Sequence, residues 1–407
     1  MELFHVVSVE EAKKIINESF NDIAQTEKVG IAQCLGRVIS KDIVSYCNVP
    51  GFRRSAVDGY AVKSSDVAGA NESIPSILTL KGEVLMGKEP PGTVYYSECY
   101  YVPTGGMLPE GTDCVIMIEY TDKLDDETVL CNSPAAPGEN VVEADEDIKQ
   151  GEVLIQAGSR LRPYEVGVLS SIGCTEVEVY KKTRIGVIST GDEVVDPEVS
   201  PKLGQVRDIN TYLLHSLIKE SGAEPFVYGV AGDEFGDLAE RVNRAYQECD
   251  IVLISGGSSV GKKDQTLKVL KSLPQSKILV HGIAVKPGKP TIIAKSGEKI
   301  IFGLPGHPLA CAVVYKVIVR HYLENLIKRS EQDYPVACKF SVNYHKAKGR
   351  EEYLPVVLNW EDCDITASPV FGKAGLITGF SKAWGYVKIE RNVEGLKAGE
   401  KVFVYKF

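Results

Sequence analysis

Four glycine-rich loops that carry acidic or basic side chains follow apolar β-type runs between residues 184 and 328. They read Thr190-Gly-Asp-Glu193, Ser255-Gly-Gly-Ser-Ser-Val-Gly-Lys-Lys-Asp264, Lys286-Pro-Gly-Lys-Pro290 and Gly303-Leu-Pro-Gly-His-Pro308. Glycines let backbone N–H groups approach an anion, carboxylates bind a hard cation, and lysines neutralise remaining negative charge. The loops therefore indicate a site for a phosphorylated ligand, assisted by a metal ion.

Alternating strands and helices are predicted to position these loops. Strands are expected at 184–189, 225–230, 250–254, 278–285 and 299–303, and helices at 209–221, 235–248, 264–273 and 308–327. Short β/α connections imply right-handed crossovers and a parallel sheet. The loops would then gather at one edge of the sheet, where ligands usually bind.

Each loop also has a purely structural interpretation. Acids after the first strand can cap the next helix, and a lysine-rich turn can simply be solvated. We favour a helix-cap role for His307, next to Pro308 in a first helical turn, over a ligand contact. The loop at 256–261 is neither a Walker loop nor a dinucleotide fingerprint. Signals of this kind are weak singly, but their concentration in the loops of one sheet favours a binding site.

Two further glycine- and proline-rich loops precede the α/β stretch. In one, Asp58 lies in the segment Gly51–Val62, and in the other, Thr104 lies in the segment Pro103–Val115. A rigid turn can present a carboxylate, and a threonine hydroxyl can donate a hydrogen bond to an oxyanion. The same letters also fit plain turns.

Composition indicates an ordinary multidomain globular protein. The chain has 407 residues, 44% of them hydrophobic and 25% charged, and a net charge of −9. Such a charge works against broad binding of nucleic acid or an anionic membrane. The ten cysteines form no C-x-x-C pair, so we expect reduced, buried thiols and no zinc site. The first residues lack the features of a signal peptide, which favours the cytoplasm.

The remaining segments divide the chain further. A capping pattern at Ser8 predicts a helical N-terminal arm, and Pro163 marks another helix start. Short β runs are expected at 45–140 and again after Ser330. We predict four units, with the first formed from two segments: 1–44 with 145–180, then 45–144, 181–329 and 330–407.

Taken together, the motifs resemble the MoeA and gephyrin E-domain family of molybdopterin molybdenumtransferases. The resemblance covers essentially the whole chain. The segments that carry it are Ser55–Val62, Thr104–Pro109, Glu139–Val141, Glu146–Ile148, Ser189–Glu193, Gly204–Asn210, Gly256–Gly261 with Asp264, Lys286–Pro290 and Gly303–Pro308.

The resemblance implies a multidomain α/β plus β fold. It comprises a discontinuous helical dimerisation domain, an inserted β domain, a MogA-like three-layer α/β domain with a parallel-type sheet, and a C-terminal β barrel. The implied partners are a second copy of the chain, making a homodimer, and a MogA-like adenylyltransferase. The implied reaction inserts molybdate, or tungstate, into adenylylated molybdopterin and releases AMP, with Mg²⁺ assisting.

The resemblance also implies roles for individual residues. The acids or hydroxyls near metal and molybdate would be Asp58, Thr104, Asp147, Glu193, Asp233 and Asp264. Of these, Asp58, Glu193 and Asp264 would bind the metal. Lys286 and Lys289 would bind phosphate or oxyanion. The ligand would be bound and its pocket shaped by Thr190, Gly191, Gly256, Gly257, Ser258, Ser259, Gly261, Pro287, Gly288, Gly303, Pro305 and Gly306.

Four positions depart from the commoner family pattern: Arg53, Glu143, His307 and Ala374. Arg53 and Glu143 change charge in opposite senses, so we hypothesise that they pair. Two other functions stay open from the sequence. One is a MogA-like molybdopterin adenylyltransferase, and the other is a non-catalytic, gephyrin-like scaffold.

Overall fold

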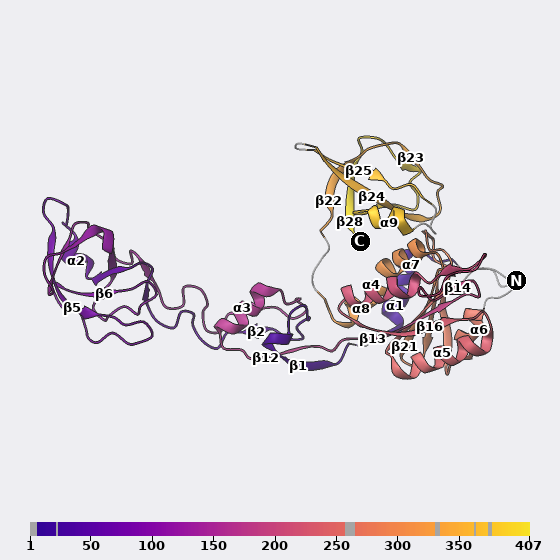
Figure 1. Ribbon diagram of the computed structural model, residues 1–407, viewed down its shortest axis with the longest axis horizontal. Helices are drawn as coiled ribbons and strands as arrows, with labels where there is room; N and C mark the ends of the chain where they lie inside the picture. The colour runs from indigo at the N-terminus through magenta and orange to yellow at the C-terminus, as the bar shows by residue number, and fades with distance from the viewer. Residues whose placement is uncertain (1–5, 22, 257–264, 330–333, 362–363, 373–376) are drawn as a thin grey trace.

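The computed structural model describes residues 6–21, 23–256, 265–329, 334–361, 364–372 and 377–407. Figure 1 shows separate units along an extended chain, with the strands β5 and β6 at one end and the α/β sheet at the other. None of the described helices is long and apolar enough to cross a membrane.

A six-stranded sheet forms the core of the α/β unit, in the order β16-β13-β17-β21-β20-β18. Its strands are β13 (Arg184–Thr190), β16 (Glu224–Ala231), β17 (Ile251–Ser255), β18 (Ser276–His281), β20 (Ile292–Ser296) and β21 (Lys299–Leu304). The first three and β21 are parallel, as predicted. β20 was not predicted; it pairs antiparallel with both β21 and β18. The sheet is therefore mixed, because the turn between Ser296 and Lys299 allows only an antiparallel return.

Helices cover both faces of this sheet (Figure 1). They are α4 (Asn210–Glu220), α5 (Phe235–Glu248), α6 (Gln265–Ser272), α7 (Pro308–Val314), the π-helical η3 (Tyr315–Val319) and α8 (Arg320–Leu326). Alternation along β17 divides the core, since Leu253 packs in one cluster with α4 and α7 residues while Ile254 packs with α5 and α6. The predicted helix 308–327 contains a π turn in its middle.

The N-terminal helix α1 (Val9–Ser19) belongs to this α/β core. The Ser8 hydroxyl accepts a hydrogen bond from the Glu11 backbone N–H at 3.1 Å, which confirms the expected cap. Ala12 and Ile16 on its buried face join the cluster that contains Phe302. The sequence analysis had grouped residues 1–44 with 145–180, but α1 packs against the sheet instead, because its apolar stripe matches the uncovered sheet face.

A small junction unit links the two ends of the molecule. Its elements are β1 (Thr26–Gly30), η1 (Ile31–Gln33), β2 (Ile43–Val44), β11 (Val153–Ile155), α3 (Pro163–Ser171) and β12 (Glu176–Tyr180). β1 pairs with β12 and β2 with β11, so two distant segments close one cluster around Ile39 and Leu169. Pro163 occupies the first turn of α3, as expected.

The β unit lies between the two segments of the junction unit in the chain. Its elements are β3 (Arg54–Ser55), β4 (Gly59–Val62), α2 (Ser64–Val67), β5 (Ser76–Glu83), β6 (Glu98–Val102), β7 (Cys114–Met117), η2 (Ile118–Tyr120), β8 (Thr121–Lys123), β9 (Thr128–Cys131) and β10 (Val141–Val142). Its six-stranded sheet runs β7-β4-β6-β5-β9-β8.

The C-terminal unit is a closed β barrel, as predicted. It contains β22 (Val336–Phe340), β23 (Tyr344–His345), β24 (Glu351–Glu361), β25 (Asp364–Pro369), α9 (Ile377–Lys382), β26 (Gly385–Ile389), β27 (Gly395–Leu396) and β28 (Lys401–Lys406). The sheet closes because β24 pairs with both β25 and β26. Strand β19 (Val285–Lys286) of the α/β unit adds to the edge at Glu351 and Glu352.

The nine cysteines within the described residues are free thiols, and most are buried. Burial raises the pKa of Cys99, Cys114, Cys131 and Cys311 to about 12. Because the thiolate is the reactive form, these thiols serve packing rather than chemistry. Cys363 lies outside the described residues.

The hypothesised pairing of Arg53 with Glu143 is confirmed, with Arg53 Nε 3.1 Å from Glu143 Oε2. Both side chains are partly exposed, so we expect a double-mutant cycle of R53E and E143R to give a coupling of about 0.5 kcal/mol in urea-unfolding free energies. Restoration should be incomplete, because Arg53 also donates to the Thr112 carbonyl. Strictly additive single changes would contradict the pairing.

Candidate functional site

The four parallel strands of the α/β unit end at one edge of the sheet, and their loops meet there. The chain leaves β13 at Thr190, β16 at Ala231, β17 at Ser255 and β21 at Leu304. Gly191 N–H donates to the Ala231 carbonyl at 3.1 Å, and Gly256 N–H donates to the Leu304 carbonyl at 3.1 Å. The predicted gathering of loops on this edge is therefore what the structure shows.

The backbone segments at this edge approach each other so closely that one position must be glycine. A Cβ atom on Gly256, whose φ is +108°, would lie 2.3 Å from the Thr190 carbonyl oxygen. Gly306 is adjacent, since a Cβ there would lie 3.5 Å from the Gly256 Cα. The three strand ends can thus approach closely only because position 256 has no side chain.

Acidic side chains surround the Thr190 end of β13. The Thr190 hydroxyl lies 3.4 Å from Asp233 Oδ1, and the Asp233 N–H donates to Asp192 Oδ1 at 2.8 Å. Glu193 folds back over Gly191, where a Cβ would lie 2.9 Å from its carboxylate. Asp192 and Glu193 are exposed. These oxygens are the hard donors that a divalent cation prefers.

Asn210 is a site residue to which the sequence analysis gave no role. Its Nδ2 donates to the Ser255 hydroxyl and to the Gly306 carbonyl, both at 2.7 Å. Its Oδ1 is buried and has no hydrogen-bond partner within the described ranges. Asn210 therefore ties two loops of the edge together and leaves one acceptor unused. The only sequence signal was its place at the start of a helix in the segment Gly204–Asn210.

A buried network of hydrogen bonds lies next to Asn210. The Ser189 hydroxyl lies 3.1 Å from Asp208 Oδ1 and 2.9 Å from the Thr211 hydroxyl. The Thr211 N–H donates to the same carboxylate oxygen of Asp208 at 3.1 Å. These bonds fix the first turn of α4 against the end of β13.

The loop from Lys286 to Pro290 lies at the same edge, because Ile292 pairs with Gly303 and sets the preceding residues beside the end of β21. Gly288 packs so closely on α7 that a Cβ would meet Val314 Cγ2 at 2.6 Å. Lys286 and Lys289 are exposed, and Pro287 is half-buried.

Lys286 is paired in this structure. Its Nζ lies 2.8 Å from Glu352 Oε1 of the barrel, which also accepts a hydrogen bond from the Tyr344 hydroxyl at 2.8 Å. Glu352 is buried, and its Oε2 has no hydrogen-bond partner in the described part of the chain. An anion that draws Lys286 away would have to compete with this carboxylate.

The glycine and proline positions after β21 differ in role. Gly303 lies inside the strand, where a Cβ would crowd Ile292 and Thr266 at 3.2 and 3.3 Å, so it serves strand packing. Pro305 is buried, while Gly306 and His307 are exposed at the edge. His307 occupies the N-cap position of α7, but its side chain makes no capping hydrogen bond.

Three predicted residues lie away from this edge. Asp58 and Thr104 meet in the β unit, where the Thr104 N–H donates to Asp58 Oδ1 at 2.8 Å. Asp147 is exposed, and its N–H donates to the Val49 carbonyl. Figure 1 places β14 (Val194–Val195), which follows Glu193, far from the β unit that contains β5 and β6. One chain alone does not bring Asp58 and Glu193 together.

Several predicted residues lie outside the described residues: Gly257, Ser258, Ser259, Gly261, Asp264 and Ala374. Among the residues that are described, no three His, Cys, Asp or Glu side chains form a metal-ligand group. The proposed metal set of Asp58, Glu193 and Asp264 thus stays a prediction.

Comparison with known proteins covers almost the whole chain. The MoeA N-terminal region (domain I and II) matches residues 7–173, a probable molybdopterin-binding domain matches 186–325, and the MoeA C-terminal region (domain IV) matches 337–407. A molybdopterin molybdenumtransferase of Haemophilus influenzae is 30% identical over 99% of both chains. One from Nostoc is 32% identical over 81% of this chain and 76% of its own.

A solved structure shows the same architecture. The molybdopterin biosynthesis MoeA protein from Pyrococcus horikoshii superimposes with a TM-score of 0.86, at 30% identity, over 99% of this chain and all of that one. Sequence, domain order and tertiary structure agree, and the chain belongs to the MoeA family.

Proposed function

We propose that this protein is a molybdopterin molybdenumtransferase that inserts molybdate into adenylylated molybdopterin and releases AMP. The observation that carries the proposal is the convergence of Thr190, Asp233, Gly256, Gly306 and the lysine loop on one sheet edge. Two relatives named molybdopterin molybdenumtransferase, which match 99% and 81% of this chain, also support the proposal.

The proposed reaction requires no covalent bond between the protein and its substrates. Two dithiolene sulfurs would replace one oxide of molybdate, which leaves as water with the two thiol protons, and water would hydrolyse the phosphoanhydride bond to AMP. Both substrates are anions, so the protein must neutralise and orient them. Lys289 and Lys286 would neutralise phosphate or oxyanion charge, and Lys286 would leave Glu352 to do so. Backbone at Gly256 and Gly306 would let the phosphates approach the sheet edge.

The donors at the edge fit Mg²⁺. Glu193 and Asp233, with Asp192 close by, offer carboxylate oxygens, and exposure at Glu193 leaves room for the water ligands that Mg²⁺ retains. When bound there, the ion would offset phosphate charge. The chain's own part is to hold the two carboxylates apart from the lysines and to orient the substrate between them.

Purified protein should convert adenylylated molybdopterin, Mg²⁺ and molybdate into active cofactor with release of AMP. We would measure AMP by chromatography and cofactor by reconstitution of an apo-molybdoenzyme. ATP consumption with free molybdopterin would instead establish the adenylyltransferase function. If the folded protein catalyses neither reaction, the scaffold function remains.

We further propose that the working form is a homodimer in which each site uses two chains. The basis is the distance between the Asp58–Thr104 pair in the β unit and the acidic edge at Glu193 (Figure 1). A β unit held away from its own α/β sheet is free to reach the sheet of a second copy. Asp58 and Thr104 would then complete the site from the partner.

Mixing two inactive variants tests this sharing of sites. D58N and E193Q should each lose activity, because each removes a carboxylate from both sites of a homodimer. After the two are mixed and exchanged, about half the dimers carry one intact site, and activity should recover to about a quarter of wild type. No recovery, with exchange confirmed by mass-tagged subunits, would reject a shared site.

Asn210→Ala should lower kcat/KM by about tenfold or more, because two hydrogen bonds that fix the loop edge are lost at about 1 kcal/mol each. Steady-state AMP release measures the effect. Ser216→Ala on the same helix is the control, since Ser216 is exposed and its hydroxyl donates to the Tyr212 carbonyl of the same helix. Equal activity of both variants would remove Asn210 from the site.

A further inference from the structure

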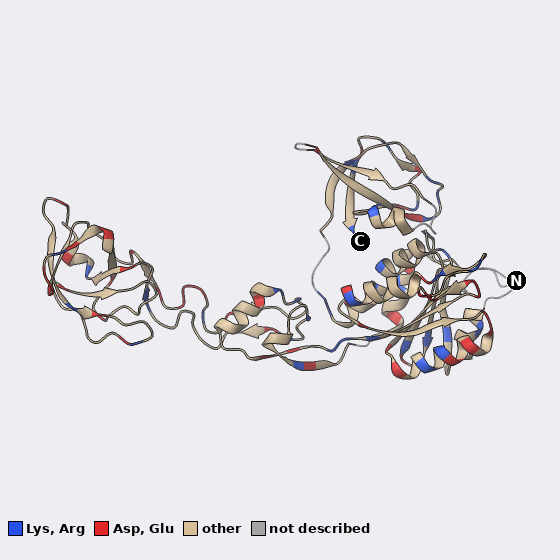
Figure 2. Ribbon diagram, in the orientation of Figure 1, with Lys and Arg blue, Asp and Glu red and all other residues tan. Residues whose placement is uncertain are grey.

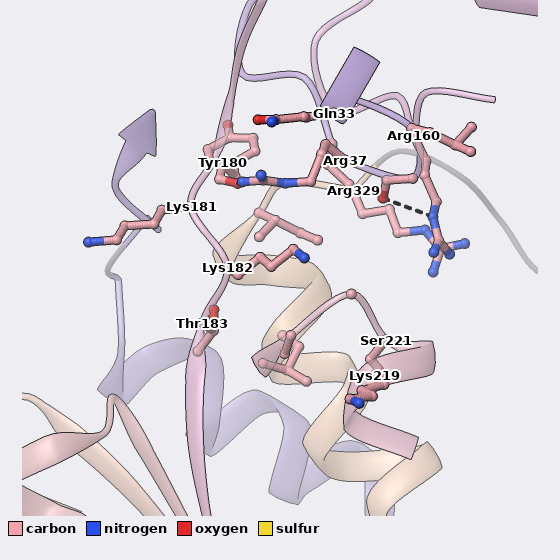
Figure 3. Close-up of a pocket in the computed structure, with 17 residues that line it drawn as sticks. Gln33, Arg37, Arg160, Tyr180, Lys181, Lys182, Thr183, Lys219, Ser221 and Arg329 are labelled. Atoms are coloured by element: carbon pink, nitrogen blue, oxygen red, sulfur yellow. Dashed lines mark hydrogen bonds between the residues drawn. The ribbon is translucent and has the colours of Figure 1, made fainter. Parts of the chain in front are cut away.

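A basic pocket lies between the junction unit and the α/β unit, apart from the sheet edge. Its volume is about 210 Å³, and Figure 3 shows the residues that line it. The basic side chains among them are Arg37, Arg160, Lys181, Lys182, Lys219 and Arg329, and none of the described residues that line the pocket is an Asp or Glu. In Figure 2 basic segments are visible where β12 continues into β13.

Two of these cations are neutralised by neighbouring acids. Arg37 Nη2 lies 2.5 Å from Glu27 Oε1, and Arg329 Nη1 lies 3.0 Å from Glu324 Oε1. The arginine side chains are therefore held in place, with 12% and 16% of their surface exposed. They shape the wall of the pocket without supplying most of its net charge.

Four cations around the pocket, Arg160, Lys181, Lys182 and Lys219, have no carboxylate within salt-bridge distance among the described residues. Arg160 donates its Nε to the Gly36 carbonyl at 3.1 Å, and Lys182 and Lys219 form no ion pair with described residues. Lys181 also lines the pocket, but it extends away from the other labelled side chains (Figure 3), and we leave it out.

Helix ends explain only part of this charge. The carbonyl end of α4 favours Lys219 in its last turn, whereas Arg329 lies beyond the last turn of α8. Arg160 follows β11 in the junction unit and Lys182 lies in the segment that joins β12 to β13, so neither faces a helix end of its own. Lys182 and Lys219 are exposed, so water screens much of the repulsion, but the grouping of these cations around one cavity favours a bound anion.

We propose that this pocket binds a small phosphate-class polyanion, of the size of inorganic pyrophosphate. The volume is below the roughly 300–1,000 Å³ of pockets for drug-sized ligands, which favours the phosphate group itself over a whole nucleotide. The proposal is independent of the proposed catalytic function.

Such an anion would bridge two units. Arg37 and Arg160 belong to the junction unit. Lys219 lies in α4 of the α/β unit, and Arg329 follows α8 of the same unit. Lys182 lies in the connection between them. A bound polyanion would thus oppose movement of the junction unit relative to the α/β unit. The orientation of these two units would then depend on the anion concentration.

Calorimetric titration of the full-length protein with inorganic pyrophosphate at low ionic strength tests the proposal. Wild type should bind, and K182Q/K219Q should bind at least about tenfold more weakly, because two of the four cations without an ion pair are lost. K277Q/K397Q is the control of equal charge, with two exposed lysines outside the pocket, and should bind like wild type. K289Q should also retain binding, which separates the pocket from the sheet edge.

Hydrogen exchange gives a local readout of the same binding. Pyrophosphate should slow exchange at residues 181–183 and 219–223 in wild type and not in K182Q/K219Q. Absence of binding by wild type, or equal binding by K182Q/K219Q, would overturn the proposal. So would a K182Q/K219Q protein that loses self-association instead, because the pocket would then receive carboxylates of a second copy.

Discussion

The close approach of strand ends at the C-terminal edge of the α/β sheet is the constraint on which the site depends. Gly256 lies almost in contact with the Thr190 carbonyl, and Gly306 lies against Gly256. A side chain at position 256 would push the end of β13 away from the loop that contains Gly306. The polar network of Asp208 and Asn210 fixes the same edge from α4.

Charge at this edge is controlled from the barrel as well as from the sheet. Glu352 is buried, accepts from Tyr344 and pairs with Lys286. A buried carboxylate that kept no partner would be costly, so an anionic substrate that takes Lys286 must offer enough attraction to offset that cost. The short pairing of β19 with β24 holds the two groups in register. The barrel thus contacts the sheet edge through the ion pair of Lys286 with Glu352.

The extended arrangement of units has two consequences. It places the Asp58–Thr104 pair beyond the reach of the acidic edge in the same chain, which is why we propose a shared site. It also makes the junction unit mechanically important, since β1 and β12 are the connection between the two ends. The basic pocket lies at that connection, where a bound anion would act on geometry rather than on chemistry.

The sequence alone predicted much of this protein. β13, α5 and the barrel strands β22, β24 and β28 followed from apolar patterns, whereas β25 and β26 were not predicted. The Ser8 cap and Pro163 helix start followed from local hydrogen-bonding rules. The loops at Thr190, Gly256 and Gly306 were identified because glycines and charges after β runs are a local pattern. The pairing of Arg53 with Glu143 was inferred from opposite charge changes.

Tertiary structure decided what local patterns do not encode. β20 was missed, since a short apolar run has no period that distinguishes it, and its antiparallel pairing depends on neighbours distant in sequence. The place of α1 in the sheet core depended on which apolar face was left uncovered. Asn210 gained its role only from Ser255 and Gly306, which are 45 and 96 residues away. Gly303 proved to be a packing residue, because a sequence shows that a side chain is absent but not what fills its space.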